Sequence, residues 1–442
     1  MTDSTTATVP ESPSLAAAIQ QFLAEMESWV RRVVQANSKG ISSGSHDGGT
    51  FMVPWASYAR TTGDPRPLRF MKMYRDRTRA RFVQDDSWSH GYWKKQEAHH
   101  GTEHFELFLG SLVGLDKTDR ETVRQLEDAA HHIGNWSEGA PDWYDWGRGV
   151  FRSLYLGTEF VGEPSLNFPE HVRMISIALI AHDATGEERY LDFAIHYGQR
   201  WAHAIVADEN LPVGIDSEGP VYQRKNGDGD YESFAGEAPD DLDLLLSKAE
   251  NLLASAVPDA MLTLWEKTDN AIYRDAAARI TEVAAEEIAN PIAWQAQAAV
   301  RRFRNRTGSE QFDELLEKVP PEQFREVGEL TMVVDPAERV GTGPLGMRSD
   351  KPDWLDENGD AAPSPPLWAL TGIIRKDIKL LRRAVDLGRA YFCIAQLVFG
   401  DITEHGCGSR SLSAVAMGHG RLNGAGVVTE VLEPAVEFSE SF

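Results

Sequence analysis

The feature that most constrains this chain is a short polar turn that recurs between segments of helical periodicity. The turn occurs four times, as Thr62-Gly63-Asp64, Thr185-Gly186-Glu187, Thr268-Asp269-Asn270 and Thr307-Gly308-Ser309. In each turn a Gly or Asn can adopt, with little strain, the left-handed backbone conformation that ends one helix. A polar residue can then cap the next helix. The pattern therefore predicts helical hairpins.

The spacing of these turns predicts how the hairpins repeat. The four threonines are separated by 123, 83 and 39 residues, close to three, two and one multiples of a length of about 40, which is typical of α-solenoids and α/α toroids. Long loops at 135–170, 207–240 and 335–366 fit a toroid better than an open array. We predict an all-α protein, a single (α/α) barrel over 15–442, after a disordered lead-in at 1–14. Short β elements are expected at 329–334 and 426–432.

Composition and charge exclude several classes of protein. The 442 residues are 42% apolar and carry a net charge of −24, which is ordinary for a globular chain and unfavourable for binding nucleic acid. No apolar run reaches the length of about 18 residues that a membrane span needs. The N-terminal segment lacks a signal-peptide pattern, so we expect a cytoplasmic protein with no membrane partner. Cys393 and Cys407 are expected to be free thiols.

The segment 85–106 holds the densest group of histidines. His100, Glu103 and His104 match the zinc motif H-x-x-E-H, so a divalent metal is a possible cofactor, although none is certain. We expect a helix to begin at Thr102, which would leave His100 outside it. The alternatives are a substrate site at a helix start, with His100 and His104 catalytic, and histidines that only pack in the core. Trp88 and His99 are candidate substrate-binding residues of the same segment.

A second candidate segment, 136–160, mixes tryptophans with charged residues. Tyr144 and Asp145 are candidate catalytic residues, and Trp143, Trp146 and Arg148 are candidate substrate-binding residues. Aromatic faces can stack on the apolar faces of sugar rings, while a buried Asp must keep a polar partner. The other interpretation is a structural loop anchored by its tryptophans.

Three further loops contribute candidates, each with an ordinary capping or tail loop as the alternative. One places Asn167 for substrate binding, and His171 and Arg173 for catalysis, just before a helix. The others add four substrate-binding candidates, namely Asp216, Tyr222, His419 and Arg421.

The repeated hairpins and the Trp143-Tyr144-Asp145-Trp146 loop resemble the α/α-toroid carbohydrate-active enzymes, which include polysaccharide lyases and unsaturated glucuronyl hydrolases. The resemblance implies a lyase that cleaves a uronate-containing oligo- or polysaccharide by β-elimination. It also implies that Asn, His, Tyr and Arg side chains share one cleft.

Other functions stay open beside the lyase. A glycoside hydrolase would use two carboxylates, with Glu103, Asp145 and Asp216 as candidates. An (α/α) barrel isomerase or dehydratase and a non-enzymatic helical scaffold are the remaining alternatives. The sequence leaves the sugar and the oligomeric state undetermined.

Overall fold

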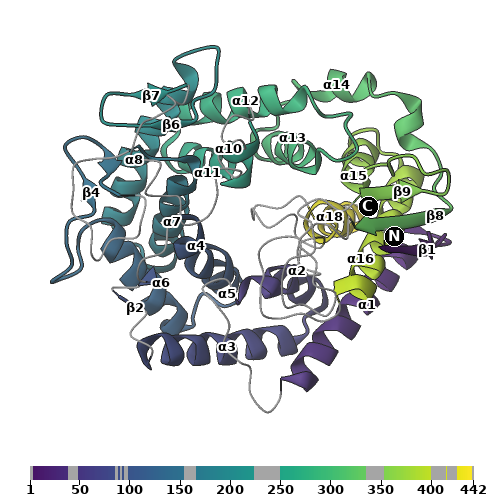
Figure 1. The fold of residues 1–442 in the computed structure, drawn as a ribbon, viewed down its shortest axis with the longest axis horizontal. Coiled ribbons are helices and arrows are strands. Elements are labelled where there is room, and N and C mark those ends of the chain that lie inside the picture. The colour runs from purple at the N-terminus through teal and green to yellow at the C-terminus, as the bar shows by residue number, and fades with distance from the viewer. Residues whose placement is uncertain are drawn as a thin grey trace. The chain divides into compact units, whose positions relative to one another are not determined.

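The computed structural model describes residues 3–37, 48–84, 88–89, 92–93, 98–153, 166–222, 249–334, 353–399, 415 and 426–440. These residues are mostly helical, with a few short strands, as predicted for an all-α protein (Figure 1). The chain divides into two compact units, and the single domain expected from the sequence stays a prediction. Unit 1 comprises residues 1–78, 285–304 and 309–442, and unit 2 comprises residues 79–284 and 305–308.

Unit 1 combines helices with one small sheet. Its elements are β1 (Asp3–Thr8), α1 (Leu15–Ala36), η1 (Thr50–Met52), α2 (Val53–Thr62), the start of α3 (Pro65–Gln84), most of α13 (Trp294–Thr307), α14 (Asp313–Glu317), η6 (Pro321–Phe324), β8 (Glu329–Val334), β9 (Asp353–Asp356), α15 (Pro365–Ile374), α16 (Ile378–Phe399), the π-helical turn η8 (Val428–Leu432) and α18 (Glu433–Glu440). Helix α1 begins at Leu15, where the predicted barrel begins, because Ser14 caps its first turn and apolar residues recur on one face.

The lead-in at 1–14 is ordered from Asp3 onward, so the prediction of disorder is wrong there. Strand β1 pairs antiparallel with β8, which pairs in turn with β9. Beyond the strand, the Ser12 hydroxyl donates to Asp386 Oδ1 at 2.6 Å and its backbone N–H donates to Oδ2 at 3.0 Å. The prediction of a strand at 329–334 is confirmed, whereas 426–432 contains η8 instead of an extended segment.

Unit 2 is built from helical hairpins joined by short β hairpins. Its elements are β2 (Trp88–Ser89), β3 (Tyr92–Trp93), α4 (Ala98–Glu103), the π-helical turn η2 (His104–Leu109), α5 (Gly110–Leu115), α6 (Arg120–Ile133), β4 (Tyr144–Asp145), β5 (Val150–Phe151), η3 (Pro169–Val172), α7 (Arg173–Thr185), α8 (Glu188–Val206), β6 (Gly214–Ile215), β7 (Pro220–Val221), α10 (Glu250–Ala254), α11 (Val257–Thr268) and α12 (Ala271–Ala285). In Figure 1 the two helices of the hairpin α7–α8 lie side by side, as their many contacts require.

The recurring turn is left-handed as predicted, although in the third copy Asp269 takes this conformation instead of a Gly or Asn. Its second residue adopts positive φ in all four copies, with values of 69°, 76°, 55° and 70°. In three copies the threonine hydroxyl donates to the carbonyl four residues earlier, and the backbone N–H two residues later donates back to that hydroxyl. The side chain thus closes one helix and opens the connection to the next, which explains why the sequence signal is reliable.

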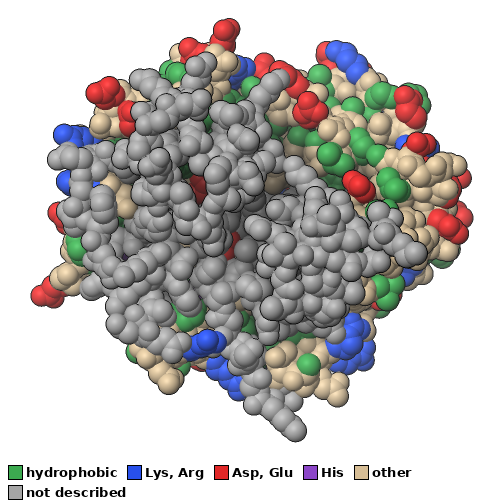
Figure 2. All heavy atoms as spheres, viewed as in Figure 1, with side chains coloured by type: hydrophobic (Ala, Val, Ile, Leu, Met, Phe, Trp, Pro, Cys, Tyr) green, Lys and Arg blue, Asp and Glu red, His purple; other side chains and the backbone are tan. Residues whose placement is uncertain are grey.

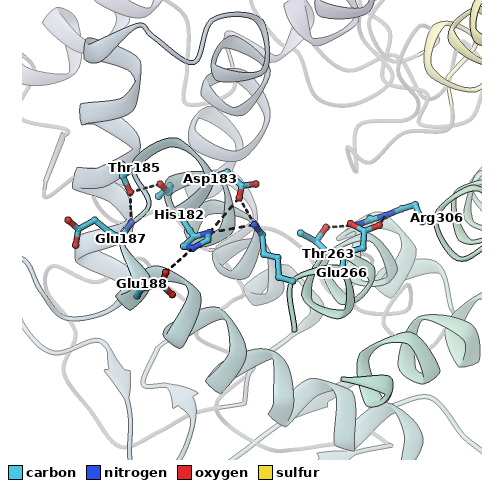
Figure 3. Close-up of polar contacts among 10 residues, drawn as sticks. His182, Asp183, Thr185, Glu187, Glu188, Thr263, Glu266 and Arg306 are labelled. Carbon is cyan, nitrogen blue, oxygen red and sulfur yellow. Dashed lines mark hydrogen bonds and ion pairs between the residues drawn. The ribbon is translucent and has the colours of Figure 1, made fainter. Parts of the chain in front are cut away.

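Ion pairs connect consecutive hairpins of unit 2 near these turns (Figure 3). Lys267 of α11 donates to the carboxylate of Asp183 on α7. One hairpin further, Arg306 donates to Glu266 Oε2 at 2.6 Å. In both pairs the basic residue immediately precedes the threonine of one turn. The acidic residue lies two residues before the threonine of the previous turn. Hairpin repetition is therefore established within unit 2, and closure of the repeats into a barrel stays a prediction.

The surface of the described residues carries mixed charge. Asp and Glu side chains are spread over the face shown in Figure 2, with Lys and Arg side chains among them. Among the helices that the structure describes, none combines the length and apolar character that a bilayer crossing requires.

Candidate functional site

A tyrosine–histidine pair lies where the β4–β5 hairpin packs on α8. The Tyr144 hydroxyl is 2.7 Å from His196 Nδ1. Trp146 follows on the same hairpin, with its ring centroid 5.2 Å from that of His196 and 36% of its surface exposed. The hairpin therefore places a buried tyrosine and a half-buried histidine beneath a half-exposed indole.

A glycine fixes this hairpin against α8. Gly149 has φ of +68°, and a Cβ there would lie 2.9 Å from Arg200 Cγ and 3.5 Å from His196 Cε1. Any side chain would both strain the turn and push the hairpin away from the helix. Arg200 Nη2 donates to Asp216 O at 2.9 Å, while its Nε has no hydrogen-bond partner among the described residues.

The surroundings of the pair set its protonation. Burial raises the pKa of Tyr144 far above its ordinary value, against the opposing effect of Arg200. Burial, assisted by Arg200, lowers the pKa of His196. At neutral pH the tyrosine thus keeps its proton and the His196 ring is neutral, so the histidine is able to accept a proton.

Asn167 joins the loops around this hairpin. Its Oδ1 accepts from the Phe151 N–H at 2.8 Å and from the Tyr197 hydroxyl at 3.0 Å, and its Nδ2 donates to Phe151 O at 3.0 Å. Its backbone pairs with Ile215. Asn167 is fully buried and connects the β4–β5 hairpin to α8 and to β6.

His171 and Trp143 converge on the Ser153 carbonyl. The His171 Nδ1 accepts from the Phe168 N–H at 3.1 Å, so its Nε2 carries the proton and faces Ser153 O at 3.2 Å. Burial lowers the pKa of His171 to about 4. Trp143 Nε1 donates to the same carbonyl at 3.3 Å. Because both ring nitrogens hold backbone groups, His171 is better placed to position the loop than to exchange protons.

The remaining candidates of these loops lie at their edges. Asp145 pairs with Arg152 at 3.1 Å and accepts from the Arg148 N–H at 3.0 Å, while the Arg148 side chain is exposed. Asp216 Oδ1 accepts from two backbone N–H groups of its own turn. Tyr222 donates to Ala204 O at 3.5 Å, at the far end of α8.

A second, more deeply buried cluster surrounds Arg173 at the start of α7. Arg173 Nη1 donates to Thr102 Oγ1 at 3.3 Å, and its Nε lies 3.6 Å from Glu106 Oε2. Burial raises the pKa of Glu106, because it outweighs the opposing effects of Arg173 and Ser176. A buried carboxyl group whose pKa is raised is a candidate proton donor.

The helix that carries the H-x-x-E-H motif begins earlier than predicted. Helix α4 starts at Ala98, and the Thr102 hydroxyl donates to Ala98 O at 2.7 Å instead of capping a helix start. The expectation that His100 lies outside the helix is therefore wrong. Gly101 before Thr102 favours a helix start at Thr102, but in the structure the turn before Thr102 is already helical.

Two of the three proposed metal ligands, Glu103 and His104, have described side chains, and both are buried. The His104 ring packs against Phe82, Phe105 and Phe108, and burial lowers its pKa to about 3. Glu103 is fully buried one residue earlier. Within the described residues, no group of three or more His, Cys, Asp or Glu side chains is arranged to hold a metal ion.

Several candidates cannot be placed in either cluster. His419 and Arg421 lie outside the described residues, and the structure describes only the backbone of Trp88, His99 and His100. Three further residues of the two clusters, namely His196, Arg200 and Glu106, are not among the candidates predicted from the sequence. His196 and Arg200 are four residues apart on an amphipathic helix that also carries Tyr197, and this spacing is the signal that could have found them.

Comparison with known proteins gives little further information. No family model matches the chain, and no curated protein sequence matches it. Among solved structures, the chain is similar to a protein described as a novel alpha-amylase from Clostridium perfringens, with 13% identity and a TM-score of 0.34. The match covers 81% of this chain and 95% of the other. At that TM-score the likeness does not transfer an activity to this chain.

Proposed function

We propose that this protein is a carbohydrate-active enzyme that cleaves a uronate-containing oligo- or polysaccharide by β-elimination. The observation that carries the proposal is the Tyr144–His196 pair, which lies under the half-exposed Trp146 and beside Arg200. An indole offers a stacking face for a sugar ring, and an arginine offers a partner for a uronate carboxylate. Arg148 adds an exposed cation on the same hairpin.

The geometry supports a specific proton path. In β-elimination a base removes the C5 proton, the electron pair forms the C4–C5 double bond, and the glycosidic oxygen leaves with a proton. His196 would accept the C5 proton at Nε2, while the buried Tyr144 hydroxyl holds its Nδ1. The resulting imidazolium would then protonate the leaving oxygen. Arg200 would neutralise the uronate carboxylate and so make the C5 proton more acidic.

Absorbance of an unsaturated uronate tests this proposal directly. The protein is incubated with pectic, alginate, ulvan and glycosaminoglycan substrates, and the substrate that responds is used for variants. We expect His196→Ala to lower kcat by about 10²- to 10⁴-fold, the usual contribution of acid–base catalysis. His203→Ala is the matched control, because His203 is an exposed histidine of the same helix. An unchanged kcat in His196→Ala, or no product from any substrate, would contradict the proposal.

A glycoside hydrolase is the second candidate function, favoured by Glu106. Its raised pKa suits a general acid, and Asp259 is close enough to influence that pKa. A hydrolase needs such a pair of carboxyl groups. Release of reducing ends without unsaturated products, abolished in Glu106→Gln, would favour hydrolysis over elimination.

A further inference from the structure

A second tryptophan lies next to Trp146 and has no role in the proton path. The Trp136 and Trp146 ring centroids are 6.0 Å apart, with their planes inclined by 45°. The guanidinium of Arg189 lies 5.4 Å from the Trp136 ring centroid and 5.3 Å from that of Tyr190. Aromatic and cationic surface therefore continues from the proposed catalytic pair along the start of α8.

The backbone holds Trp136 in place before any ligand binds. Its ring lies on Gly134, where a Cβ would come within 2.3 Å of the indole. The Trp136 N–H donates to His131 O at 2.6 Å, and the preceding Asn135 adopts φ of 63°. Trp146 is tied to the same point, because its Nε1 donates to Gly134 O at 3.3 Å. Two indoles fixed on one glycine form a preorganised surface, which reduces the entropy lost on binding.

The charges around Trp136 indicate the kind of contact it offers. Arg189 Nη2 is 2.8 Å from His131 Nε2, and Arg189 Nε is 3.7 Å from Glu187. Glu127 and Asp128 also lie close enough to influence His131. The three carboxylates here outnumber the single arginine, which suits the hydroxyl groups of a sugar better than a second carboxylate.

We propose that Trp136 and Arg189 form a second sugar-binding subsite beside Trp146, so that the substrate is a chain of at least two sugar residues and not a free monosaccharide. This inference rests on the proposed function, since it takes Trp146 as the neighbouring subsite. It favours a polymer-cleaving enzyme over a small-molecule isomerase.

Affinity electrophoresis tests the subsite apart from catalysis. All variants carry His196→Ala, so that the polymer is not degraded, and migrate through gels containing alginate, polygalacturonate, ulvan or hyaluronan. We expect Trp136→Ala to weaken binding by about 2- to 10-fold, the range that one aromatic contact supplies. Trp294→Ala is the matched control, because Trp294 is a half-buried tryptophan of unit 1 that packs on Tyr391. Equal retardation of the two variants, or retardation of no variant by any polymer, would overturn the subsite.

Chain length separates a subsite from a merely structural tryptophan. With oligosaccharides of the retarding polymer, Trp136→Ala should leave the affinity for a monosaccharide unchanged and weaken that for longer chains. A loss of equal size at every length would mean that Trp136 only shapes the loop. If Trp136→Ala fails to fold, Arg189→Ala and Trp136→Phe carry the same comparison. Binding without any cleavage would refute the proposed function and leave the subsite standing.

Discussion

Two buried glutamates occupy equivalent positions in the two units and behave in opposite ways. Glu106 is the third residue of the π-helical turn η2 in unit 2, and Glu430 is the third residue of η8 in unit 1. Glu430 accepts from Arg301 Nε and from Arg302 Nη2, both at 2.7 Å. Glu106 Oε2 lies 3.6 Å from Arg173 Nε, beyond hydrogen-bond distance.

The pKa values follow from this difference in pairing. Burial alone would raise the pKa of both carboxyls. At Glu430 the two arginines overcome burial and hold the pKa below its ordinary value, whereas at Glu106 the weaker contact with Arg173 leaves the pKa raised. The comparison teaches that the same local backbone can build a structural anchor or a carboxyl group with a raised pKa, depending on about 1 Å of arginine placement.

Removing the charge of Glu430 should produce the largest loss of stability. Glu430→Gln leaves two arginines facing an amide, and breaking a buried pair of this kind costs about 3–5 kcal/mol. We expect the lower end, because Arg301 and Arg302 keep 15% and 23% of their side chains exposed. Urea unfolding measures the loss. Glu433→Gln, which affects a pair with the half-exposed Arg60, should cost no more than about 1 kcal/mol.

Acid should remove the contribution of Glu430. Its pKa is lowered in the folded state, so the stability it supplies is present above the unfolded value of about 4.3 and is lost as the pH falls through the folded value. The difference in unfolding free energy between the wild type and Glu430→Gln should therefore shrink on acidification from pH 5. A difference that stays constant would show that the arginines do not hold this carboxylate.

Glu106→Gln should have a small effect that depends on pH in the opposite sense. Because the folded pKa is raised, ionisation of Glu106 destabilises the fold as the pH rises above about 4.3, the unfolded value. The variant should thus match the wild type within about 1 kcal/mol at pH 4 and gain stability relative to it at pH 7. A loss comparable to that of Glu430→Gln would mean that Glu106 is a second anchor.

The exposed ion pair between Asp183 and Lys267 in unit 2 should make the smallest contribution to stability. Asp183 is half exposed and Lys267 is 20% exposed, so a double-mutant cycle between Asp183→Ala and Lys267→Ala should give a coupling of about 0.2–1 kcal/mol. The value should fall in high salt. A coupling of several kcal/mol would contradict this expectation, because it would show that the pair contributes as much as a buried ion pair.

The sequence predicted local helical structure well and tertiary packing less well. The turns of Thr62, Thr185 and Thr268 follow from side chains within four residues, which is why their geometry could be read directly. The break between α15 and α16 at Lys376 gives no such sequence signal, since a lysine rarely takes positive φ. Strand β1 was missed because its polar residues become a strand only by pairing with β8, hundreds of residues away.

The candidate site shows the same difference between residues with a local sequence signal and residues defined by distant contacts. The loop with Trp143, Tyr144 and Trp146 was found because aromatic and charged residues are concentrated there. His196 was missed because its partner is 52 residues away on the β4–β5 hairpin. Glu106 was missed because it is surrounded by apolar residues in sequence, and only burial beside Arg173 gives it an unusual pKa.

Mass analysis of the reaction products tests the central claim most directly. The wild type and His196→Ala are compared on whichever uronate polymer the wild type degrades. The account predicts products with an unsaturated uronate at the new end, one water lighter than hydrolysis products, and their near absence in His196→Ala. Products that contain the added water, or unsaturated products formed equally by both proteins, would contradict it.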